Sequence, residues 1–289
     1  MSDFGGQNMF GRLRRVLVAR PGTAFGGADP RRWHYAASPE PAAARQEHDR
    51  LVGILEASGA LVCRHDADAV ASADAIFVHD PCIVTDGGAI LLNMGKPLRR
   101  DEPEAVGATL QRLGVPVMAR LEGEQRAEGG DLLWLDEKTL AVGIGFRTNA
   151  AGAAALRRAL APLAVAVVEV PLPYFEGPDA CLHLMSVVSV VDRDLAVVYP
   201  RLLPVPFWQR LRDADYALVE VPEDEFPSMG PNVLALAPRH VLMLEGNPRT
   251  RARLERAGCR VEVYRGHEIS LKAEGGATCL TRPILREAD

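Results

Sequence analysis

The stretch that decides the fold runs from Asp80 to Arg120 and reads DPCIVTDGGAILLNMGKPLRRDEPEAVGATLQRLGVPVMAR. Two short apolar segments flank an Asp-Gly-Gly turn, which indicates two neighbouring strands. A stretch of alternating acidic and apolar residues follows and predicts a helix that ends at a glycine. The predicted elements are strands over Cys82–Thr85 and Ala89–Asn93, a helix over Glu102–Leu113 and a strand over Val115–Arg120. The stretch therefore predicts one ββαβ unit.

The same order of elements recurs along the chain at a spacing of roughly fifty residues, which is typical of a repeat architecture. The later units start at Asp131, His183, Asn232 and Cys279. The last unit has only one strand, and its missing parts stand at the front of the chain. These parts of the fifth unit are Leu280–Leu285 at the end and Arg15–Ala19, Pro41–Ser58 and Leu61–Arg64 at the front.

Five ββαβ units, the last of them stitched from both termini, would close a ring without a long open edge. The alternative is an open sheet of parallel βαβ units. In the middle three units the predicted helices cover Asn149–Leu160 and the residues after Pro206 and Pro248. The strands there are predicted over Leu132–Leu135, Thr139–Gly143, Val165–Val170, Met185–Val191, Leu195–Tyr199, Ala217–Val221, Val233–Leu236, Val241–Leu244 and Arg260–Tyr264.

The composition is that of an ordinary globular chain, with 289 residues, of which 48% are hydrophobic and 25% charged. We expect one domain over residues 1–289, with residues 1–14 as a flexible leading segment. The net charge of −5 gives no basic field for nucleic acid or an anionic membrane. No apolar run reaches the roughly 20 residues that span a bilayer. Five cysteines without a CxxC pair favour a reduced, cytoplasmic compartment and no zinc site.

The residues that start the units have the chemistry of a reactive site. If the units are related by pseudo-symmetry, these residues meet near the axis: Asp80, Glu128–Asp131, His183, Asn232 and Cys279. Carboxylates, an imidazole and a thiol would then converge. Such a convergence is needed for catalysis, whereas a hydrophobic core avoids it because buried charges are costly unless they are paired. Cys279 follows the Gly-rich run EGGAT, whereas the other cysteines are interpreted as small buried apolar residues. The remaining histidines, His34, His48, His65, His240 and His267, are interpreted as surface or loop residues.

Six motifs in this order resemble the dimethylarginine dimethylaminohydrolases, which belong with arginine deiminases and amidinotransferases to the pentein, or guanidine-modifying, superfamily. They are FVHDP (Phe77–Pro81), LRR (Leu98–Arg100), EGGD (Glu128–Asp131), GFRTN (Gly145–Asn149), CLHL (Cys181–Leu184) and EGGATC (Glu274–Cys279). The likeness covers nearly the whole chain from about Arg15 onward. It implies a five-bladed α/β propeller, in agreement with the repeat.

The resemblance also implies roles for individual residues. Cys279 matches the family's nucleophile, His183 its general acid/base, and Asp80 and Glu128 the carboxylates that hold the guanidinium. The implied binding residues for the rest of the substrate are Arg99 and Arg147 for an α-carboxylate, Asp74 near the amino-acid end, and His79 and Ala273. His79 departs from the pattern, because close relatives often carry an acidic residue there. Met185 favours the dimethylaminohydrolase branch, because the deiminases carry a carboxylate at that position.

The activity implied is hydrolysis of an Nω-methylated L-arginine to L-citrulline and a methylamine through a covalent thiouronium intermediate, without a metal or other cofactor. A small guanidine is the expected partner, nucleic acid and membrane are not, and a homodimer is left open. The alternatives are an arginine deiminase-like hydrolase or amidinotransferase, and a non-catalytic binding protein on the same fold. Residues 21–33 stand where relatives have a substrate lid, but they show no clear lid pattern.

Overall fold

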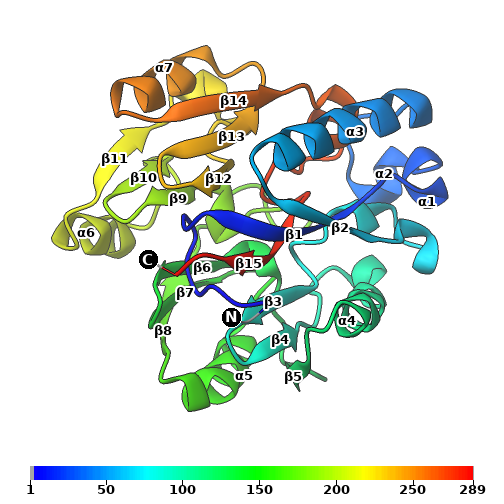
Figure 1. Cartoon of the computed structure of the whole chain (residues 1–289), viewed down its shortest axis with the longest axis horizontal. Helices are drawn as coiled ribbons and strands as arrows, with labels where there is room; N and C mark the ends of the chain where they lie inside the picture. Colours follow the sequence, from blue (N-terminus) through cyan, green and yellow to red (C-terminus); the bar gives the residue numbers. More distant parts are fainter. Residues whose placement is uncertain (1–2, 289) are drawn as a thin grey trace.

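The computed structural model describes residues 3–288, and these form five three-stranded sheets arranged as blades around a centre (Figure 1). Within a blade the first two strands pair antiparallel, and the third joins in parallel after a helix. The first blade consists of β3 (Cys82–Thr85), β4 (Gly88–Leu91), α4 (Glu102–Arg112) and β5 (Val117–Arg120). The predicted five-bladed α/β propeller is confirmed.

The other blades repeat this order. The second is β6 (Leu132–Asp136), β7 (Thr139–Ile144), α5 (Ala150–Leu160) and β8 (Ala166–Pro171). The third is β9 (Val188–Asp192), β10 (Leu195–Val198), α6 (Val205–Asp213) and β11 (Ala217–Glu220). The fourth is β12 (Val233–Ala237), β13 (His240–Leu244), α7 (Pro248–Arg256) and β14 (Arg260–Tyr264). Most predicted bounds lie within two residues of these.

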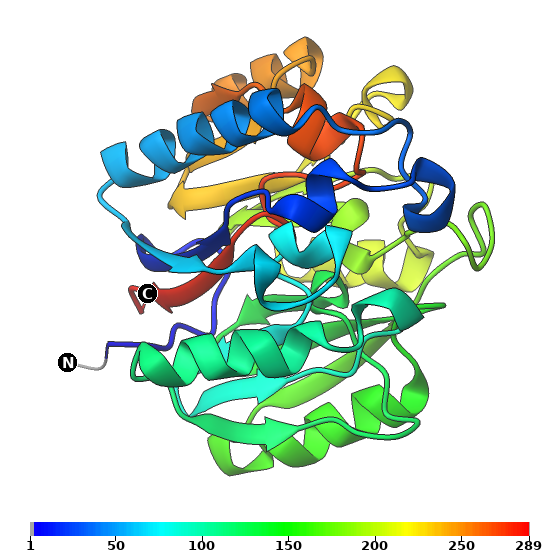
Figure 2. The same cartoon turned by 90° about the vertical axis from the view of Figure 1, so that its right-hand side faces the viewer.

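The fifth blade is made from both ends of the chain. It contains β15 (Arg282–Arg286), β1 (Leu13–Ala19), α3 (Pro41–Ala57) and β2 (Leu61–His65). Leu17 in β1 pairs antiparallel with Arg282 and parallel with Cys63, so the last strand of the chain, β15, joins β1 and β2 in the sheet of the fifth blade. Figures 1 and 2 show the red C-terminal strand beside the blue N-terminal one. This pairing closes the ring.

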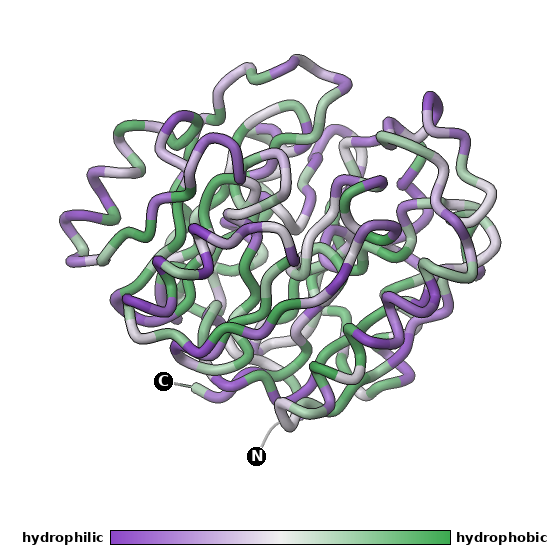
Figure 3. The backbone as a smooth tube through the Cα atoms, turned by 90° about the horizontal axis from the view of Figure 1, so that it is seen from above, coloured by the Kyte–Doolittle hydropathy of each residue, from purple (hydrophilic) through white to green (hydrophobic). Residues whose placement is uncertain are grey.

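The inner strands carry the core. Strands β3, β4, β10 and β12 are buried along their full length, which explains why they read as continuous apolar runs rather than alternating ones. Hydrophobic segments gather in the middle of the molecule (Figure 3). Around the centre, β3 contacts β15, β6 contacts β9, and β9 contacts β12. The segments that precede these first strands are therefore brought together. Among residues 3–288, no helix has the length and apolar character to cross a membrane.

The N-terminal segment, which was predicted to be flexible, makes backbone contacts with the last strand. Gly5 donates its N–H to the Ile284 carbonyl at 2.8 Å and accepts from the Arg286 N–H at 3.0 Å. Gln7 and Asn8 are buried, and β1 already begins at Leu13. Backbone pairing with β15 thus places Gly5 against the fifth blade. Polar composition alone does not reveal such pairing.

Two further predictions are wrong in part. The strand predicted from Met185 begins only at Val188, because Leu184–Ser186 form a 3-10 turn in which the Ser186 hydroxyl accepts from the His183 N–H at 3.1 Å. His48 lies in α3 with no exposed surface, and burial lowers its pKa to about 4, so its ring is neutral at physiological pH. His65 is also buried, with Nδ1 2.9 Å from the Thr109 hydroxyl.

Candidate active site

A cavity of about 460 Å³ receives side chains from all five units. Asp80 comes from the first unit, Arg147 from the second, His183 from the third, Asn232 from the fourth and Cys279 from the fifth. Four of these are unit-start residues, each placed on the turn or loop just before the first strand of its blade. The structure thus brings together residues that lie far apart in the sequence.

The two glycines of the EGGD motif permit close approach at the centre. A Cβ on Gly130 would lie 2.3 Å from Nδ1 of His183, and one on Gly129 would lie 2.1 Å from the His79 carbonyl oxygen. Any side chain at either position would push these groups apart. The glycines therefore let the Glu128 backbone pass directly beneath the imidazole.

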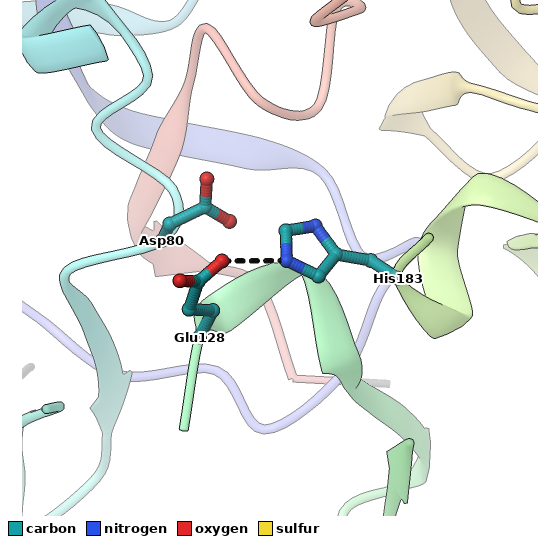
Figure 4. A group of neighbouring side chains, drawn as sticks. All are labelled: Asp80, Glu128 and His183. Carbon is teal, nitrogen blue, oxygen red and sulfur yellow. Dashed lines mark hydrogen bonds and ion pairs between the residues drawn. The ribbon is translucent and has the colours of Figure 1, made fainter. Parts of the chain in front are cut away.

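Glu128 and His183 form a buried ion pair. His183 Nε2 lies 2.8 Å from Glu128 Oε2, and Figure 4 shows the two groups facing each other beside Asp80. Glu128 Oε1 accepts a hydrogen bond from the backbone N–H of Lys96 at 3.0 Å. Burial alone would raise the pKa of Glu128, but the His183 hydrogen bond and the Arg147 charge hold it well below its usual range. Burial likewise opposes the charge on His183, but Cys181, Asp131 and Glu128 hold its pKa well above normal. An imidazolium facing a carboxylate results, and it is suited to donate a proton.

Asp80, Glu128 and His183 also have the spacing of a metal cluster, because one ligand atom from each lies within 4.8 Å of the others. Two arginine side chains already contact the carboxylates of this cluster. Asp80 Oδ2 pairs with Arg99 at 2.7 Å, and Arg147 lies 3.5 Å from Glu128 Oε2. An imidazolium must also lose its proton before it can bind a metal. The arrangement fits a flat, singly charged cation that carries several N–H donors better than a divalent metal ion.

Cys279 lies at the end of a Gly-rich approach. A Cβ on Gly275 would lie 2.2 Å from the Phe77 ring, and one on Gly276 would lie 2.4 Å from Asn232. Asn232 donates from Nδ2 to the Cys279 sulfur at 3.5 Å. Burial and the Asp80 charge raise the pKa of Cys279, while His183 acts in the opposite direction. The thiol is thus protonated at neutral pH in the absence of a bound cation, which would favour the thiolate.

The two predicted carboxylate-binding arginines differ in how their donors are used. Arg99 is buried and donates to Glu102 from Nε and Nη2, to Asp80 from Nη1, and to the Phe77 carbonyl from Nη2. Most of its N–H groups therefore serve the protein. Arg147 lines the cavity, and its one ion pair in the described part of the chain is the long contact with Glu128. Arg147 is the arginine with donors left for a substrate.

The remaining predicted binding residues separate into two groups. Asp74 and Ala273 line the cavity, but His79 does not. The His79 ring is hydrogen-bonded through Nδ1 to the Thr281 carbonyl at 2.8 Å, and its backbone N–H donates to the Cys279 carbonyl at 3.2 Å. Burial and nearby Arg282 lower its pKa to about 3, so the ring is neutral. His79 therefore supports the backbone around Cys279.

The family model for N,N dimethylarginine dimethylhydrolase, eukaryotic, matches residues 28–286 of this chain. The chain belongs to the dimethylarginine dimethylaminohydrolase family. The resemblance found in the six motifs is thereby confirmed, and the protein is a hydrolase acting on C–N bonds in amidines.

Curated members of the dimethylarginine dimethylaminohydrolase family include similar proteins from two bacteria. The enzyme of Pseudomonas aeruginosa is 29% identical over 208 residues, which cover 72% of this chain and 76% of the relative. That of Streptomyces coelicolor is 31% identical over 218 residues, covering 72% and 73%. An arginine deiminase of Rhodococcus opacus is 34% identical over 207 residues, but these cover only 58% of this chain and 50% of the deiminase.

Solved structures support the same fold. The dimethylarginine dimethylaminohydrolase of Pseudomonas aeruginosa in complex with citrulline matches with a TM-score of 0.77 at 23% identity, covering 94% of this chain and 99% of that one. An amidinotransferase from Microseira wollei matches with a TM-score of 0.79 at 17% identity, covering 99% and 98%. At these identities the matches report the shared propeller rather than a shared substrate.

Sequence reasoning missed several cavity residues of this family member. Cys181, which was expected to be a buried apolar residue, lines the cavity with its sulfur 3.7 Å from His183 Nδ1. Its position two residues before His183 could have indicated this. Tyr35 and Lys96 also line the cavity and carry no motif signal. Asn232 was named only as the start of a unit, and its contact with the Cys279 sulfur gives it a role.

Replacement of Asn232 by alanine should make the Cys279 thiolate harder to form. The side chain is oriented for this contact, because its Oδ1 accepts from both the N–H and the hydroxyl of Thr278 at 3.0 Å. Loss of a donor to a charged group costs about 1.5–3 kcal/mol, so we expect roughly a tenfold or larger fall in kcat and a higher thiol pKa. The pH dependence of Cys279 alkylation measures that pKa. A profile unchanged from wild type would show that Asn232 is only structural.

Proposed function

We propose that this protein hydrolyses a substituted guanidine by nucleophilic catalysis, with Cys279 as nucleophile and His183 as acid and base. The proposed reaction at the guanidine end converts an Nω-methylated arginine to citrulline and a methylamine. The observation that carries the proposal is the cavity itself, in which a thiol, an imidazolium and the Asp80 carboxylate come from separate units, with the buried Glu128 carboxylate paired with that imidazolium at 2.8 Å. A guanidinium is a poor electrophile, and such a site holds it and supplies a strong nucleophile.

The proposed steps use only groups of this chain, the substrate and water. The Cys279 thiolate bonds to the central guanidinium carbon, and the C–N bond to the substituted nitrogen breaks as His183 donates a proton to the departing amine. The thiouronium that results is held by the carboxylates. Neutral His183 then takes a proton from water, and the hydroxide adds to the same carbon. The C–S bond breaks and the added hydroxyl loses its proton to solvent, where the released amine is protonated, so that a neutral urea group and the thiolate remain. Proton transfer of this kind contributes about 10²–10⁴-fold.

Two features favour the methylated substrate over arginine. The relatives from Pseudomonas aeruginosa and Streptomyces coelicolor, which match over about three quarters of both chains, are dimethylarginine dimethylaminohydrolases. Met185, beside the His183 turn, is buried and apolar where the deiminase pattern has a carboxylate. The arginine deiminase matches keep a deiminase-like reaction, with ammonia as leaving group, as the second candidate.

The test is to identify the released amine. The purified protein is incubated with Nω,Nω-dimethyl-L-arginine, Nω-methyl-L-arginine or L-arginine, with and without glycine as an amine acceptor, and the products are analysed by mass spectrometry. Dimethylamine or methylamine with a ureido product supports the proposal. Ammonia from arginine alone would favour the deiminase reaction, and a product formed only with glycine would favour amidino transfer. No product, together with no thiol that a guanidine protects from alkylation, would favour a binding protein.

A further inference from the structure

Lys96 places its ammonium in the wall of the cavity, where three groups hold it. Nζ donates to Asp74 Oδ2 at 2.6 Å and to the Trp33 carbonyl at 2.8 Å, and it lies 5.2 Å from the centre of the Trp33 ring. The Lys96 side chain is only 11% exposed. Carboxylate, carbonyl and aromatic face are the groups that recognise a substrate ammonium, and here the protein supplies that cation itself.

The Asp74 carboxylate is fully used by these internal contacts. Its second oxygen accepts the Tyr35 hydroxyl proton at 2.7 Å, and Arg99 Nε lies 3.9 Å from the first. The Asp74 side chain is 6% exposed. The other buried carboxylate that lines the cavity, Asp80, belongs to the guanidinium end, as does Glu128, which is paired with His183 and does not itself line the cavity. In the described chain, the deep wall therefore has no carboxylate left for an ammonium on the substrate's tail.

Arg147 is in the opposite situation. It lines the same cavity, and its closest acidic group is Glu128 Oε2 at 3.5 Å. A planar guanidinium with most of its N–H groups uncommitted is suited to bind a carboxylate through two hydrogen bonds. The cavity thus offers one cation, Arg147, with donors left for an anion, while its Asp74 carboxylate already holds another cation, Lys96.

We propose that Lys96 is a specificity-determining residue that selects guanidines with a tail carboxylate but no free α-ammonium. This inference rests on the proposed hydrolysis at the guanidine carbon and changes the preferred substrate of the same cavity from free Nω-methylarginine to Nω-methylated guanidino acids whose α-amino group is absent or blocked. An α-ammonium directed at Asp74 would meet the Lys96 ammonium within a few ångströms, where burial leaves their repulsion poorly screened. To admit it, Lys96 would have to leave Asp74 and the Trp33 carbonyl together.

The carboxylates at the mouth do not replace Asp74. Glu176, Asp179 and Glu274 line the outer cavity and are exposed. An ammonium paired with Glu176 or Asp179 stays in water, where such pairs contribute little, and the charge of Lys96 already acts on Glu274, where it opposes the rise in pKa that burial causes. These groups can attract any cationic guanidine during approach without distinguishing one tail from another.

A matched pair of substrates tests the inference. Nω-methyl-L-arginine and 5-(N′-methylguanidino)pentanoate differ only in the α-amino group, so the ratio of their kcat/KM values measures discrimination at the tail. We expect wild-type protein to favour 5-(N′-methylguanidino)pentanoate by about tenfold or more. Repulsion between two buried like charges commonly exceeds the free energy that corresponds to a tenfold change in affinity. In Lys96→Ala the ratio should fall by about tenfold or more because Asp74 is freed. Lys96→Arg keeps the positive charge and should therefore keep the wild-type ratio of kcat/KM values.

The outcomes separate this inference from the proposed function. A wild-type preference for Nω-methyl-L-arginine, or a ratio that Lys96→Ala leaves unchanged, would overturn the role of Lys96 while hydrolysis stands. If neither compound yields a ureido product, the proposed function fails, and calorimetric binding of the same pair to wild type and Lys96→Ala decides the tail preference without turnover. Lys96→Met serves if the alanine variant does not fold, because it keeps the length of the side chain without the charge.

Discussion

Cys279→Ser is expected to abolish turnover, with kcat falling by about 10³-fold or more while the fold is retained. The exchange replaces one sulfur by one oxygen beside Asn232, so packing around residue 279 changes little. The chemistry changes greatly, because a serine hydroxyl does not ionise near neutral pH and a bound guanidinium cannot lower its pKa enough. Ureido product formation measures the loss, and intact-mass spectrometry of quenched wild-type protein should show a covalent adduct that the variant lacks.

Cys181→Ser is the matched control, because Cys181 is the other thiol in the cavity and its sulfur lies 3.7 Å from His183 Nδ1. This variant should still form the adduct, with its pH profile displaced, because Cys181 is one of the groups that raise the pKa of His183. The assignment of the nucleophile would be refuted by the reverse pattern, in which Cys279→Ser turns over and Cys181→Ser forms no adduct.

The ring of blades was predictable because its strands carry two strong signals. Inner strands such as Cys82–Thr85 are buried on both faces, so they appear as unbroken apolar runs between turn residues. The spacing of these runs then predicts the repeat. Elements without such a signal were missed. The helices α1 (Thr23–Gly26) and α2 (Pro30–Trp33) have four residues each, which is too short for a hydrophobic period to appear.

The burial of His48 could have been predicted from the helix period. Ala44, His48, Leu51, Val52 and Leu55 follow the three- and four-residue spacing of one helix face, and all are buried in α3. The residue type, rather than its position, led to the wrong interpretation. A polar side chain on an apolar face is placed by its neighbours, because the helix cannot expose one member of the stripe alone.

The members of the candidate site that start a unit were predictable, but their contacts were not. The repeat spacing brings Asp80, His183 and Cys279 to one centre, since each precedes the first strand of its unit. The repeat spacing does not predict which charged side chains pair with each other. Arg99 is paired with Glu102 three residues later, a spacing that the sequence could have revealed. The contact of Lys96 with Asp74 depends on how two loops approach each other, and no local pattern encodes that distance.

Glu128→Gln should both weaken guanidine binding and lower the pH at which activity is lost on the alkaline side. The carboxylate holds His183 as an imidazolium through the 2.8 Å contact between Oε2 and Nε2. Among the groups that outweigh the effect of burial on His183, Cys181 and Asp131 remain in the variant, but Glu128 does not. The pKa of His183 therefore falls, and the proton needed by the leaving amine is lost at lower pH. A loss of about 10²–10⁴-fold in kcat/KM is expected at neutral pH.

The pH dependence of kcat/KM distinguishes this electrostatic role from a purely structural one, because a general loss of structure would lower the whole profile without displacing one limb. Glu274→Gln removes one negative charge from the exposed mouth of the same cavity, and it should leave the alkaline limb where wild type has it. An alkaline limb that stays in place in Glu128→Gln would mean that another group titrates there. Since a guanidinium and an imidazolium both need the Glu128 carboxylate, its loss should affect substrate binding and proton transfer together.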